Sequence, residues 1–309
     1  MLRLATFNLK DLFLPDVRAA DQAFEAKLFA DKTRYVADRL LRAQADVVAL
    51  QEVGEPAALD AVLSLVPGYA AVVGTPDDRG IRCAVLSRRP IVRSAVHTTA
   101  ALPFPVFVEG DPPPYGTALP LRRGIVEVVV THEPFGDVHV FCIHMKSNLP
   151  RKLRKPTGED VPLAGSFQRA EATVRSTVIR AAEALYLRRL ADEAASPHVC
   201  VMGDLNDDRR SLSLRILYGD RETDRVLLSA IERVPEHKRW TTLHGGRPSQ
   251  IDHVLLTPGL HGAIVRADVL NEDLRDHGPP VKDAPRTPDS DHALYWVDLG
   301  EPSPPSSEG

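Results

Sequence analysis

The stretch VCVMGDLNDD, residues 199–208, decides which class of fold the chain adopts. Its first part, Val199 to Met202, is an uninterrupted apolar run, which is typical of a strand buried on both faces. The chain then turns at Gly203 and presents a polar end: Asp204, Asn206, Asp207 and Asp208. Carboxylates this close together repel one another. Either the segment is a solvated loop, or a positive group lies beside it.

Patterns of strands and helices extend on both sides of this stretch. Apolar runs or alternation predict strands at 2–8, 45–52, 69–74, 83–88, 91–96, 124–132, 138–146, 198–203, 250–257 and 292–299. Helical spacing predicts helices over 32–43, 58–66 and 166–194. A hairpin is expected around Glu133–Gly136. Because helices and strands interleave while hairpins are frequent, we expect an α/β protein with mixed sheets packed face to face and helices outside.

The domain organisation follows from length and composition. The chain has 309 residues, 43% hydrophobic and 26% charged, enough to bury one core without disulfides. Repeats and a break in composition are absent, so we expect a single domain over residues 1–300. The Pro/Ser-rich tail, residues 301–309, is predicted to be disordered. Loops are expected at 103–120, 150–165 and 271–290.

The cysteines and the lack of targeting patterns predict the compartment. Cys83, Cys142 and Cys200 each lie in an apolar, strand-like run, and an odd count without paired spacing argues against a disulfide framework or a zinc cluster. Reduced core cysteines indicate a reducing compartment. The sequence shows no signal-peptide pattern and no apolar run of about 18 residues, so we expect a cytoplasmic protein without a membrane partner.

The charge of the chain limits its partners. The formal net charge is −4, so contact with nucleic acid requires local basic patches. Such patches occur at Arg88–Arg89, at Arg122–Arg123 and within 151–155. Each of them, taken alone, is best explained as a solvated loop.

Polar residues of a few chemical types end the predicted strands. They are Asn8, Glu52, His144, Asp204, Asn206, Asp252, Asp291 and His292. Each has an ordinary explanation by itself: a turn residue, a solvated strand end, a structural histidine, or an Asx turn after Gly203. The ordered set is much harder to obtain by chance. Sites are assembled from loops and strand ends at one edge of a sheet, so we expect these side chains to converge.

Hydrolysis of a phosphate ester is the chemistry that this set favours. Glu52, Asp204 and Asp291 supply the hard oxygen ligands that a divalent cation needs, and the cation would offset their mutual repulsion. Acidic ligands without a Cys/His cluster favour Mg²⁺ or Mn²⁺ over Zn²⁺. Such an ion also neutralises charge on phosphoryl oxygens.

The remaining members suit phosphate contact and proton handling. Asn8 and Asn206 can donate to phosphate oxygens or orient ligands, and His144 can donate to a non-bridging oxygen. His292 can handle a proton, with Asp252 fixing its tautomer and orientation. On an extended chain Asp204 and Asn206 share one face, which we predict looks into the site. Asp207 and Asp208 are expected to be caps or solvated residues.

The motifs resemble those of a known family. TFNL (6–9), LQE (50–52), IHMKS (143–147), GDLND (203–207), IDHVL (251–255) and SDH (290–292) occur in the order found in the endonuclease/exonuclease/phosphatase superfamily, the DNase I-like fold. The resemblance extends over residues 6–299. It implies a four-layered α/β/β/α sandwich with the active site at one edge.

The resemblance also implies a metal site. Glu52 would be the main ligand, helped by Asn8, with Asp291 near the ion. Some family members carry an aspartate two residues after the first asparagine, where this chain has Lys10, so a metal role for Asp11 is not implied.

For the reaction itself, the resemblance implies His292 as the catalytic histidine, oriented by Asp252. Asp204 would position or activate the attacking water. His144 would contact the scissile phosphate, and Asn206 would bind phosphate.

Two stretches resemble a bacterial, nuclease-like branch of this superfamily: HMKSN at 144–148 and RRGIVEV at 122–128. In that branch, the positions of Arg123 and Lys146 would line the path of the phosphates. We therefore expect a metal-dependent nuclease acting on nucleic acid, with DNA favoured as the substrate, and without an obligate protein partner.

A phosphatase or phosphodiesterase acting on a small molecule or a lipid head group is the alternative, since the superfamily uses one core for both chemistries. The few aromatic residues, 6%, do not show a platform for stacking single strands. A scaffold without activity is disfavoured because no core position is missing.

Overall fold

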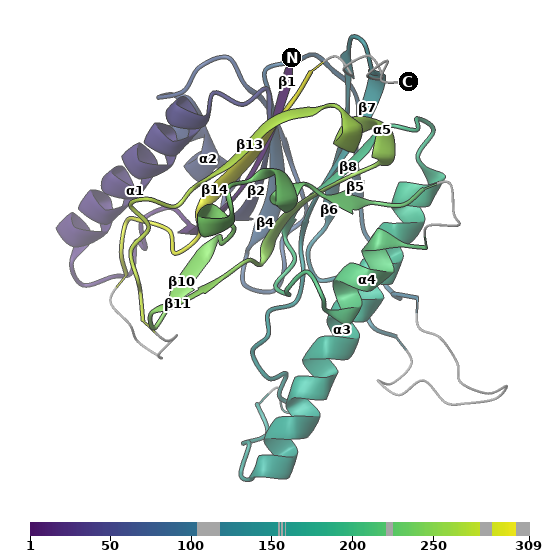
Figure 1. Cartoon of the computed structure of the whole chain (residues 1–309). Coiled ribbons are helices and arrows are strands. Elements are labelled where there is room, and N and C mark those ends of the chain that lie inside the picture. Colours follow the sequence, from purple (N-terminus) through teal and green to yellow (C-terminus); the bar gives the residue numbers. More distant parts are fainter. Residues whose placement is uncertain are drawn as a thin grey trace, which may run out of the picture.

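The computed structural model describes residues 1–103, 118–153, 155, 157, 159–220, 225–278 and 286–300. The tail predicted at 301–309 and most of the loop predicted at 103–120 lie outside the described residues. Figure 1 shows two sheets between helices.

The first sheet has six strands in the order β13-β14-β1-β2-β4-β3. Its members are β1 (Leu2–Leu12), β2 (Val47–Val53), β3 (Ala70–Val73), β4 (Arg82–Ser87), β13 (Ile264–Leu270) and β14 (Leu294–Leu299). β1 and β2 are parallel, with Leu4 opposite Val47, and the other pairs are antiparallel. The sheet is therefore mixed, as the sequence predicted.

The second sheet also has six strands, in the order β5-β6-β7-β8-β12-β9. They are β5 (Ile91–His97), β6 (Ile125–His132), β7 (Gly136–His144), β8 (Val199–Asp204), β9 (Leu228–Ser229) and β12 (Asp252–Leu256). β7 and β8 are parallel, and β6 and β7 form the predicted hairpin, in which His132 pairs with Gly136. A separate two-stranded ribbon joins β10 (Thr242–His244) to β11 (Arg247–Ser249).

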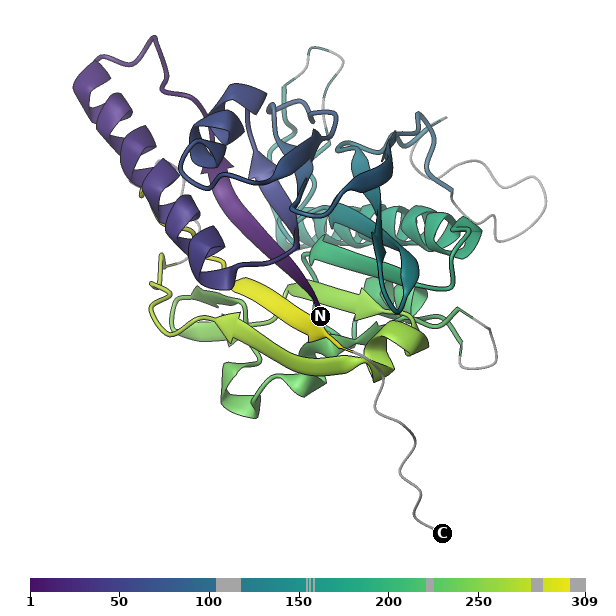
Figure 2. The same ribbon diagram turned by 90° about the horizontal axis from the view of Figure 1, so that it is seen from above.

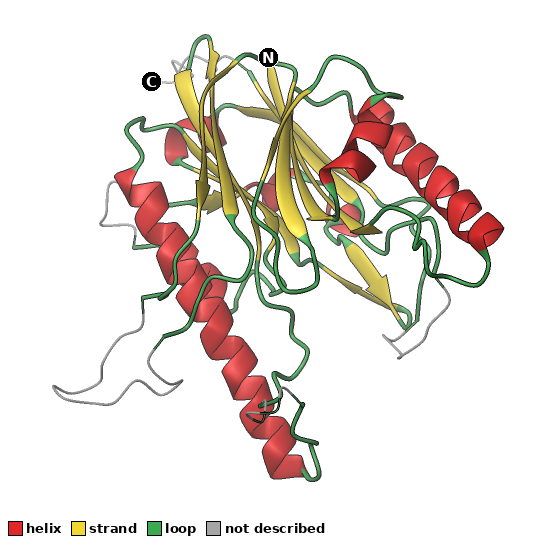
Figure 3. Cartoon of the chain, turned by 180° about the vertical axis from the view of Figure 1, so that it is seen from behind, coloured by secondary structure: helices red, strands yellow, loops and turns green. Residues whose placement is uncertain are grey.

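Helices cover the outer face of each sheet, and the two inner faces pack together. α1 (Gln22–Ala43) and α2 (Pro56–Leu63) pack on the first sheet, whereas α3 (Ser166–Glu193) and α4 (Leu212–Tyr218) pack on the second. α5 (Pro258–Gly262) is a short turn before β13. Figure 2, seen from above, and Figure 3, seen from behind, show the resulting four layers. The predicted α/β/β/α sandwich is confirmed.

Period-two alternation decides which side chains fill the middle of the sandwich. In β1, Leu2 and Leu4 join the core between the sheets, whereas Ala5, Phe7 and Leu9 pack toward α1. β8 behaves in the same way: Cys200 and Met202 point inward, and Val199 and Val201 point toward α3. Each buried aliphatic side chain contributes about 1.5–3 kcal/mol, so the register of the strands is strongly specified.

α3 is longer than the sheet that it covers. Its 28 residues span about 42 Å, whereas the six residues of the neighbouring β8 span about 20 Å. The amino-terminal half of α3 therefore projects past the sheets, as Figures 1 and 3 show. It projects beyond the edge at which β7 and β8 end, because the chain enters α3 after β7 and leaves it before β8.

Several elements differ from the sequence-based prediction. α1 begins at Gln22 instead of residue 32, because Asp21 caps it by accepting from the Phe24 N–H at 2.8 Å. α2 begins earlier than predicted, with Pro56 in its first turn. The first strand continues past Asn8 to Leu12. The elements β9, β10, β11, β13, α4 and α5 were not predicted.

Candidate active site

The inward rows of the two sheets end in polar side chains. The row of Leu2, Leu4 and Thr6 in β1 continues to Asn8, and that of Cys200 and Met202 in β8 continues to Asp204. Likewise, His144 and Asp252 continue the inward rows of β7 and β12. In the register of the second sheet, Asp204 lies between these two residues, opposite His144 on one side and Asp252 on the other. Alternation alone thus brings Asn8, His144, Asp204 and Asp252 to one edge.

Local backbone distortions bring further residues to this edge. Non-glycine residues with positive φ are Lys10, Asp11, Gln44, Glu52 and Asn206, with values between 47° and 60° among the described residues. Gln44 is the left-handed cap of α1, and the other four surround the site. The strain at each costs on the order of 1 kcal/mol. The pairing of β1 with β2 is interrupted between Asn8 and Leu12, where Lys10 and Asp11 lie. At Glu52 the positive φ breaks the alternation that would otherwise turn this side chain toward α1.

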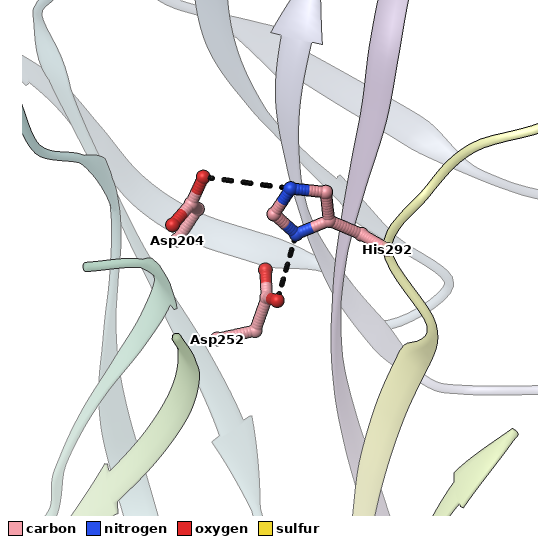
Figure 4. A group of neighbouring side chains, drawn as sticks. All are labelled: Asp204, Asp252 and His292. Atoms are coloured by element: carbon pink, nitrogen blue, oxygen red, sulfur yellow. Dashed lines mark hydrogen bonds and ion pairs between the residues drawn. The ribbon is translucent and has the colours of Figure 1, made fainter. Parts of the chain in front are cut away.

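His292 and Asp252 form a buried pair. His292 Nδ1 lies 2.8 Å from Asp252 Oδ2, and its Nε2 lies 4.0 Å from Asp204 Oδ2 (Figure 4). Burial disfavours the charged imidazolium, but the charge of Asp252 and its hydrogen bond outweigh burial and raise the pKa of His292 to about 10. The Ser290 hydroxyl accepts from the His292 N–H and donates to the Asn8 carbonyl, which anchors the segment to β1.

Asp204 lies at the centre of the cluster. Its Oδ2 accepts from Asn8 Nδ2 at 2.9 Å and lies 3.5 Å from His144 Nε2, while its Oδ1 accepts from the Asn206 N–H at 2.9 Å. Burial raises the pKa of Asp204 to about 7, opposed by the positive charge of His292. A group with this pKa can exchange a proton near neutral pH.

Glu52 and His144 face one another across the two sheets. His144 Nε2 lies 3.8 Å from Glu52 Oε1, which also lies 3.4 Å from Asn8 Nδ2. Burial, followed by the charge of Asp11, raises the pKa of Glu52. Burial, followed by the charge of Arg123, holds the pKa of His144 well below its usual range, so this ring is neutral. Its Nδ1 is buried and has no hydrogen-bond partner among the residues that the structure describes.

Asp291 immediately precedes His292 in the sequence, but its side chain belongs to a different network from the His292–Asp252 pair. Its Oδ2 lies 3.0 Å from His244 Nε2 and 3.3 Å from Lys10 Nζ. Burial opposes ionisation, but His244, His292 and Lys10 outweigh it and keep the pKa of Asp291 far below its usual range. The predicted metal ligand is thus an ionised carboxylate that two basic side chains already contact.

Lys10 and His244 also belong to the site, because both contact Asp291, although neither was predicted from the sequence. His244 lies in the ribbon β10–β11, whose turn is Gly245-Gly246. A Gly-Gly pair between two short extended segments is a hairpin signal and could have revealed this ribbon. Lys10 has no such signal, since its position depends on the positive φ of the strand end.

Arg123 and Lys146 brace the segment that follows β7. Arg123 Nη1 donates to the His144 carbonyl at 3.0 Å, and its Nε lies 3.1 Å from Asp77 Oδ2. Lys146 Nζ donates to the carbonyl oxygens of Ser147 and Leu149 at 2.7 and 2.8 Å. Both are at most 7% exposed. Their predicted contact with phosphates stays a prediction.

The opening stretch separates into different roles. Asn206 has a φ of 53°, so the chain after Asp204 is not extended as expected, and its Nδ2 donates to the Met145 carbonyl at 3.1 Å. Asp207 is not solvated: its Oδ2 lies 3.2 Å from Arg180 Nε on α3. Asp208 is exposed and accepts from the Arg210 N–H, as a cap does.

The chemistry of the donor set fits a divalent cation. Asp204 is a buried carboxylate and Glu52 a half-buried one, and their raised pKa values show that too little positive charge surrounds them. Asp252 Oδ1 is buried, and no described residue forms a hydrogen bond with it. Oxygen donors suit Mg²⁺ or Mn²⁺.

The charges of the neighbouring side chains indicate where such an ion would bind. Ligand atoms of Asp204, Asp252 and His292 lie within 4.8 Å of one another and could form a metal group. However, a protonated His292 repels a cation, and Asp252 already holds its Nδ1. Glu52, on the other side of Asp204, is therefore the better ligand. The Asn8 side chain turns its Nδ2 toward these carboxylates, while its Oδ1 accepts from the Lys10 N–H.

The arrangement can combine three chemical functions at one point. It offers acidic oxygens for a cation, a neutral histidine beside them, and a charged histidine held by a buried carboxylate. A protonated His292 can donate to a phosphoryl oxygen or a leaving group, and an ionised Asp204 can accept a proton from water. This combination suits hydrolysis of a phosphoric ester.

The comparisons with known proteins agree with this chemistry. The model of the Endonuclease/Exonuclease/phosphatase family matches residues 23–292. No curated protein matches the chain.

Among solved structures, an endonuclease/exonuclease/phosphatase family protein from Bacteroides thetaiotaomicron is similar at 20% identity and a TM-score of 0.60, with 96% of this chain and 93% of that chain covered. A mannosyl-6-phosphatase from the same organism has 20% identity and a TM-score of 0.59, with 97% and 100% covered. The human Nocturnin catalytic domain has 15% identity and a TM-score of 0.56, with 97% and 94% covered. At these identities the likeness to the three structures shows the fold alone.

Proposed function

The chain belongs to the endonuclease/exonuclease/phosphatase family, and we propose that it is a divalent-metal-dependent nuclease that hydrolyses phosphodiester bonds in DNA. Phosphoester hydrolysis is the coarser activity that the family supports. The choice of a nucleic acid as substrate, the metal and the roles of single residues are our proposals.

In this proposal, Glu52, helped by Asn8 and with Asp291 nearby, holds Mg²⁺ or Mn²⁺. The ion, when bound, supplies positive charge to the phosphoryl oxygens. Asp204 positions the attacking water and takes its proton, which its pKa of about 7 supports.

The two histidines act on the phosphate. His292 donates its proton to the phosphoryl or leaving oxygen, and Asp252 keeps it charged and oriented at 2.8 Å. His144, neutral and 3.5 Å from Asp204, donates from Nε2 to a non-bridging oxygen. Asn206 offers its amide to the same phosphate.

Positively charged side chains on both sides of the catalytic cluster support the proposal that the substrate is a polymer. Lys10 lies on one side, 3.3 Å from Asp291, and Arg123 and Lys146 lie on the other, bonded to the segment at His144–Leu149. A monoester has one phosphate, whereas a nucleic acid strand has one on each side of the scissile bond. The amino-terminal half of α3 projects past the sheets, which gives a long substrate more surface to contact.

Hydrolysis of a small-molecule or lipid phosphate is the second candidate. A cavity of about 880 Å³ lined by Lys10, Asp11 and neighbouring residues favours it, because such a volume could enclose a small ligand. The similar structure named as a mannosyl-6-phosphatase is consistent with that activity on this fold.

One experiment separates the candidates. The purified protein is incubated with Mg²⁺ or Mn²⁺, and separately with EDTA, against plasmid DNA, linear DNA, RNA, inositol phosphates and bis(p-nitrophenyl) phosphate. We expect cleavage of DNA and of the diester that EDTA stops. Cleavage of monoesters alone would refute the nuclease proposal.

We also propose a cytoplasmic location and a protein that works without an obligate partner. The support is that Cys83, Cys142 and Cys200 are free and buried, as in proteins of a reducing compartment. None of the helices among the described residues is both long and apolar enough for a bilayer-spanning segment. Detection of the protein in a membrane or secreted fraction of the source cells would contradict this location.

A further inference from the structure

The cavity of about 880 Å³ opens directly beside the candidate site. Its walls are residues 10, 11 and 13–17, the α1 residues Leu28, Phe29 and Lys32, and Glu55, Arg286 and Thr287. Two contacts join it to the site: the Asp11 N–H donates to Glu52 Oε2 at 3.1 Å, and Lys10 Nζ lies 3.3 Å from Asp291 Oδ2. The end of the cavity at Lys10 and Asp11 therefore lies next to the candidate site.

Most charged side chains of the cavity wall already have partners. Arg286 Nη1 lies 2.9 Å from Glu25 Oε1, so this guanidinium is neutralised. On the acidic side, Glu55 accepts from the Leu14 N–H at 3.0 Å and Asp16 from the Arg18 N–H at 2.9 Å. These backbone contacts shape the loop. They leave the negative charges of Asp16 and Glu55 in place, but both residues are exposed, so solvent screens these charges.

Lys32 is the exception. Its side chain is buried, with the residue 4% exposed, and its Nζ donates to the Asp289 carbonyl at 3.2 Å. Within the part of the chain that the structure describes, no carboxylate lies within 4.0 Å of this ammonium. Burial, followed by the charge of Lys10, lowers the pKa of Lys32 to about 8. The more distant charges of Asp11, Asp291 and Glu52 offset burial only in part, so a bound anion would relieve a cost that the protein now carries.

The rest of the wall is apolar. Phe13 and Phe29 are half-buried, and they lie in the same cavity as Leu14, Pro15, Val17 and Leu28. Aromatic side chains beside a cation suit a nucleotide, because the base packs on the rings while the phosphate pairs with the ammonium. A chloride or a free carboxylate would use the charge and leave the apolar wall exposed.

We propose that this cavity binds the nucleotide next to the scissile bond, with its phosphate on Lys32 and its base against Phe13 and Phe29. The inference rests on the proposed nuclease function and deepens it, because it assigns the recognition of one flanking phosphate to a residue outside the catalytic cluster. Lys32 here is a substrate-binding residue, and Lys10 connects its pocket to the site.

A binding experiment tests the pocket independently of activity. The full chain with ¹³C-labelled lysines is titrated with inorganic phosphate in EDTA, and the Lys32 signal is assigned from the spectrum of Lys32→Met. We expect phosphate to shift the Cε resonance of Lys32 and to raise its apparent pKa, with no change at Lys27, which lies on the same helix with a side chain 76% exposed. A Lys32 signal that does not respond overturns the proposal, even if the protein cleaves DNA.

A kinetic experiment tests the role of the pocket in the reaction. The thymidine dinucleotide TpT is compared with pTpT and TpTp, which carry a second phosphate at either end. We expect the wild type to prefer one phosphorylated form, and Lys32→Met to lower kcat/KM for that form about ten- to a hundredfold. The rate on TpT should stay within about twofold. Lys32→Arg, which keeps the charge, should retain the preference, and Lys27→Met should behave as wild type.

The outcomes separate this inference from the function on which it rests. An equal loss on all three dinucleotides in Lys32→Met would overturn the inference, since it would mean that Lys32 supports the site as a whole. A phosphate-dependent shift at Lys32 without hydrolysis of any dinucleotide would refute the nuclease function and keep the anion site. If Lys32→Met does not fold, Lys32→Arg supplies the assignment and the titration of the wild type decides.

Discussion

His292 Nδ1 and Asp252 Oδ2 lie 2.8 Å apart, with side chains that are 9% and 0% exposed. A hydrogen bond between charged groups that are shielded from solvent is strong, and this one holds the imidazole ring of His292 with its Nε2 toward Asp204. Because Asp252 lies on β12 and His292 precedes β14, this pair also joins the two sheets of the sandwich. The proton on His292 therefore depends on how the sheets pack.

Substitution of the carboxylate should separate charge from shape. We predict that Asp252→Asn lowers kcat by about 10²–10⁴-fold, because His292 loses the charge that keeps it protonated and the acceptor that orients it. The fold should survive, since asparagine has the same shape. Steady-state kinetics with a diester substrate and circular dichroism check both points. His132→Asn, a histidine change outside the site, is the control, and activity of Asp252→Asn equal to that control would contradict the role of the pair.

Metal removal should affect both activity and stability. We predict that EDTA abolishes hydrolysis, that Mg²⁺ or Mn²⁺ restores it, and that saturating Mg²⁺ raises the melting temperature, because a ligand of the folded state alone stabilises it. Glu52→Gln should remove the activity and the Mg²⁺-dependent shift together. Calorimetric or fluorescence melting curves with and without Mg²⁺ measure this. If Mg²⁺ raises the melting temperature of Glu52→Gln as much as that of the wild type, Glu52 is not a metal ligand.

Acid stability should depend on a carboxylate far from the site. On the second sheet Glu127 Oε1 lies 2.6 Å from His139 Nδ1, and its Oε2 lies 2.7 Å from His97 Nε2. Burial opposes ionisation, but the hydrogen bonds to His139 and His97 outweigh it and lower the pKa of Glu127 from 4.5 to about 2. Because its pKa is lower in the folded protein, ionised Glu127 stabilises the fold in full at pH values above its pKa in the unfolded chain. This stabilisation is lost as the pH falls from about 4.5 to about 2.

The contribution of Glu127 should be about 1–2 kcal/mol near neutral pH, allowing for solvent screening. We expect Glu127→Gln to lower the free energy of unfolding by this amount at pH 7 and to converge with the wild type toward pH 2. Urea unfolding at a series of pH values measures it, with Glu171→Gln on the exposed face of α3 as the control. A difference that is independent of pH would mean that packing, and not charge, is lost.

The sequence predicts most of the sandwich because burial imposes a period of two on its strands. In β8 and β12 the inward apolar rows are uninterrupted, so both the strands and the polar residues that end them are visible without coordinates. The ribbon β10–β11 and the edge strand β13 are harder to predict, since only part of each is buried and the alternation is weak.

The predicted site residues converge, but their partners could not be predicted. His244 reaches Asp291 across 47 positions of sequence, and Lys32 reaches the Asp289 carbonyl across 257. Such contacts depend on how loops pack, which local patterns do not encode. The positive φ values at Lys10 and Glu52 are equally hidden, because they break the propensities from which a strand is predicted.

The three aspartates of GDLNDD should respond to amidation in three different ways. Asp204→Asn should abolish hydrolysis and leave the metal-free protein at least as stable as the wild type, because burial already raises the pKa of this carboxyl to about 7 and ionisation at neutral pH is unfavourable. Asp207→Asn should keep the catalytic cluster but cost about 2–4 kcal/mol, since it leaves the buried Arg180 guanidinium, with a side chain 4% exposed, without its counter-charge. Asp208→Asn should change the rate of hydrolysis and the free energy of unfolding little, because asparagine also caps the exposed turn. Urea unfolding in EDTA and kinetics of the three variants give the comparison. A strongly destabilised Asp204→Asn, or an Asp207→Asn as stable as Asp208→Asn, would show that charge is distributed differently around this turn.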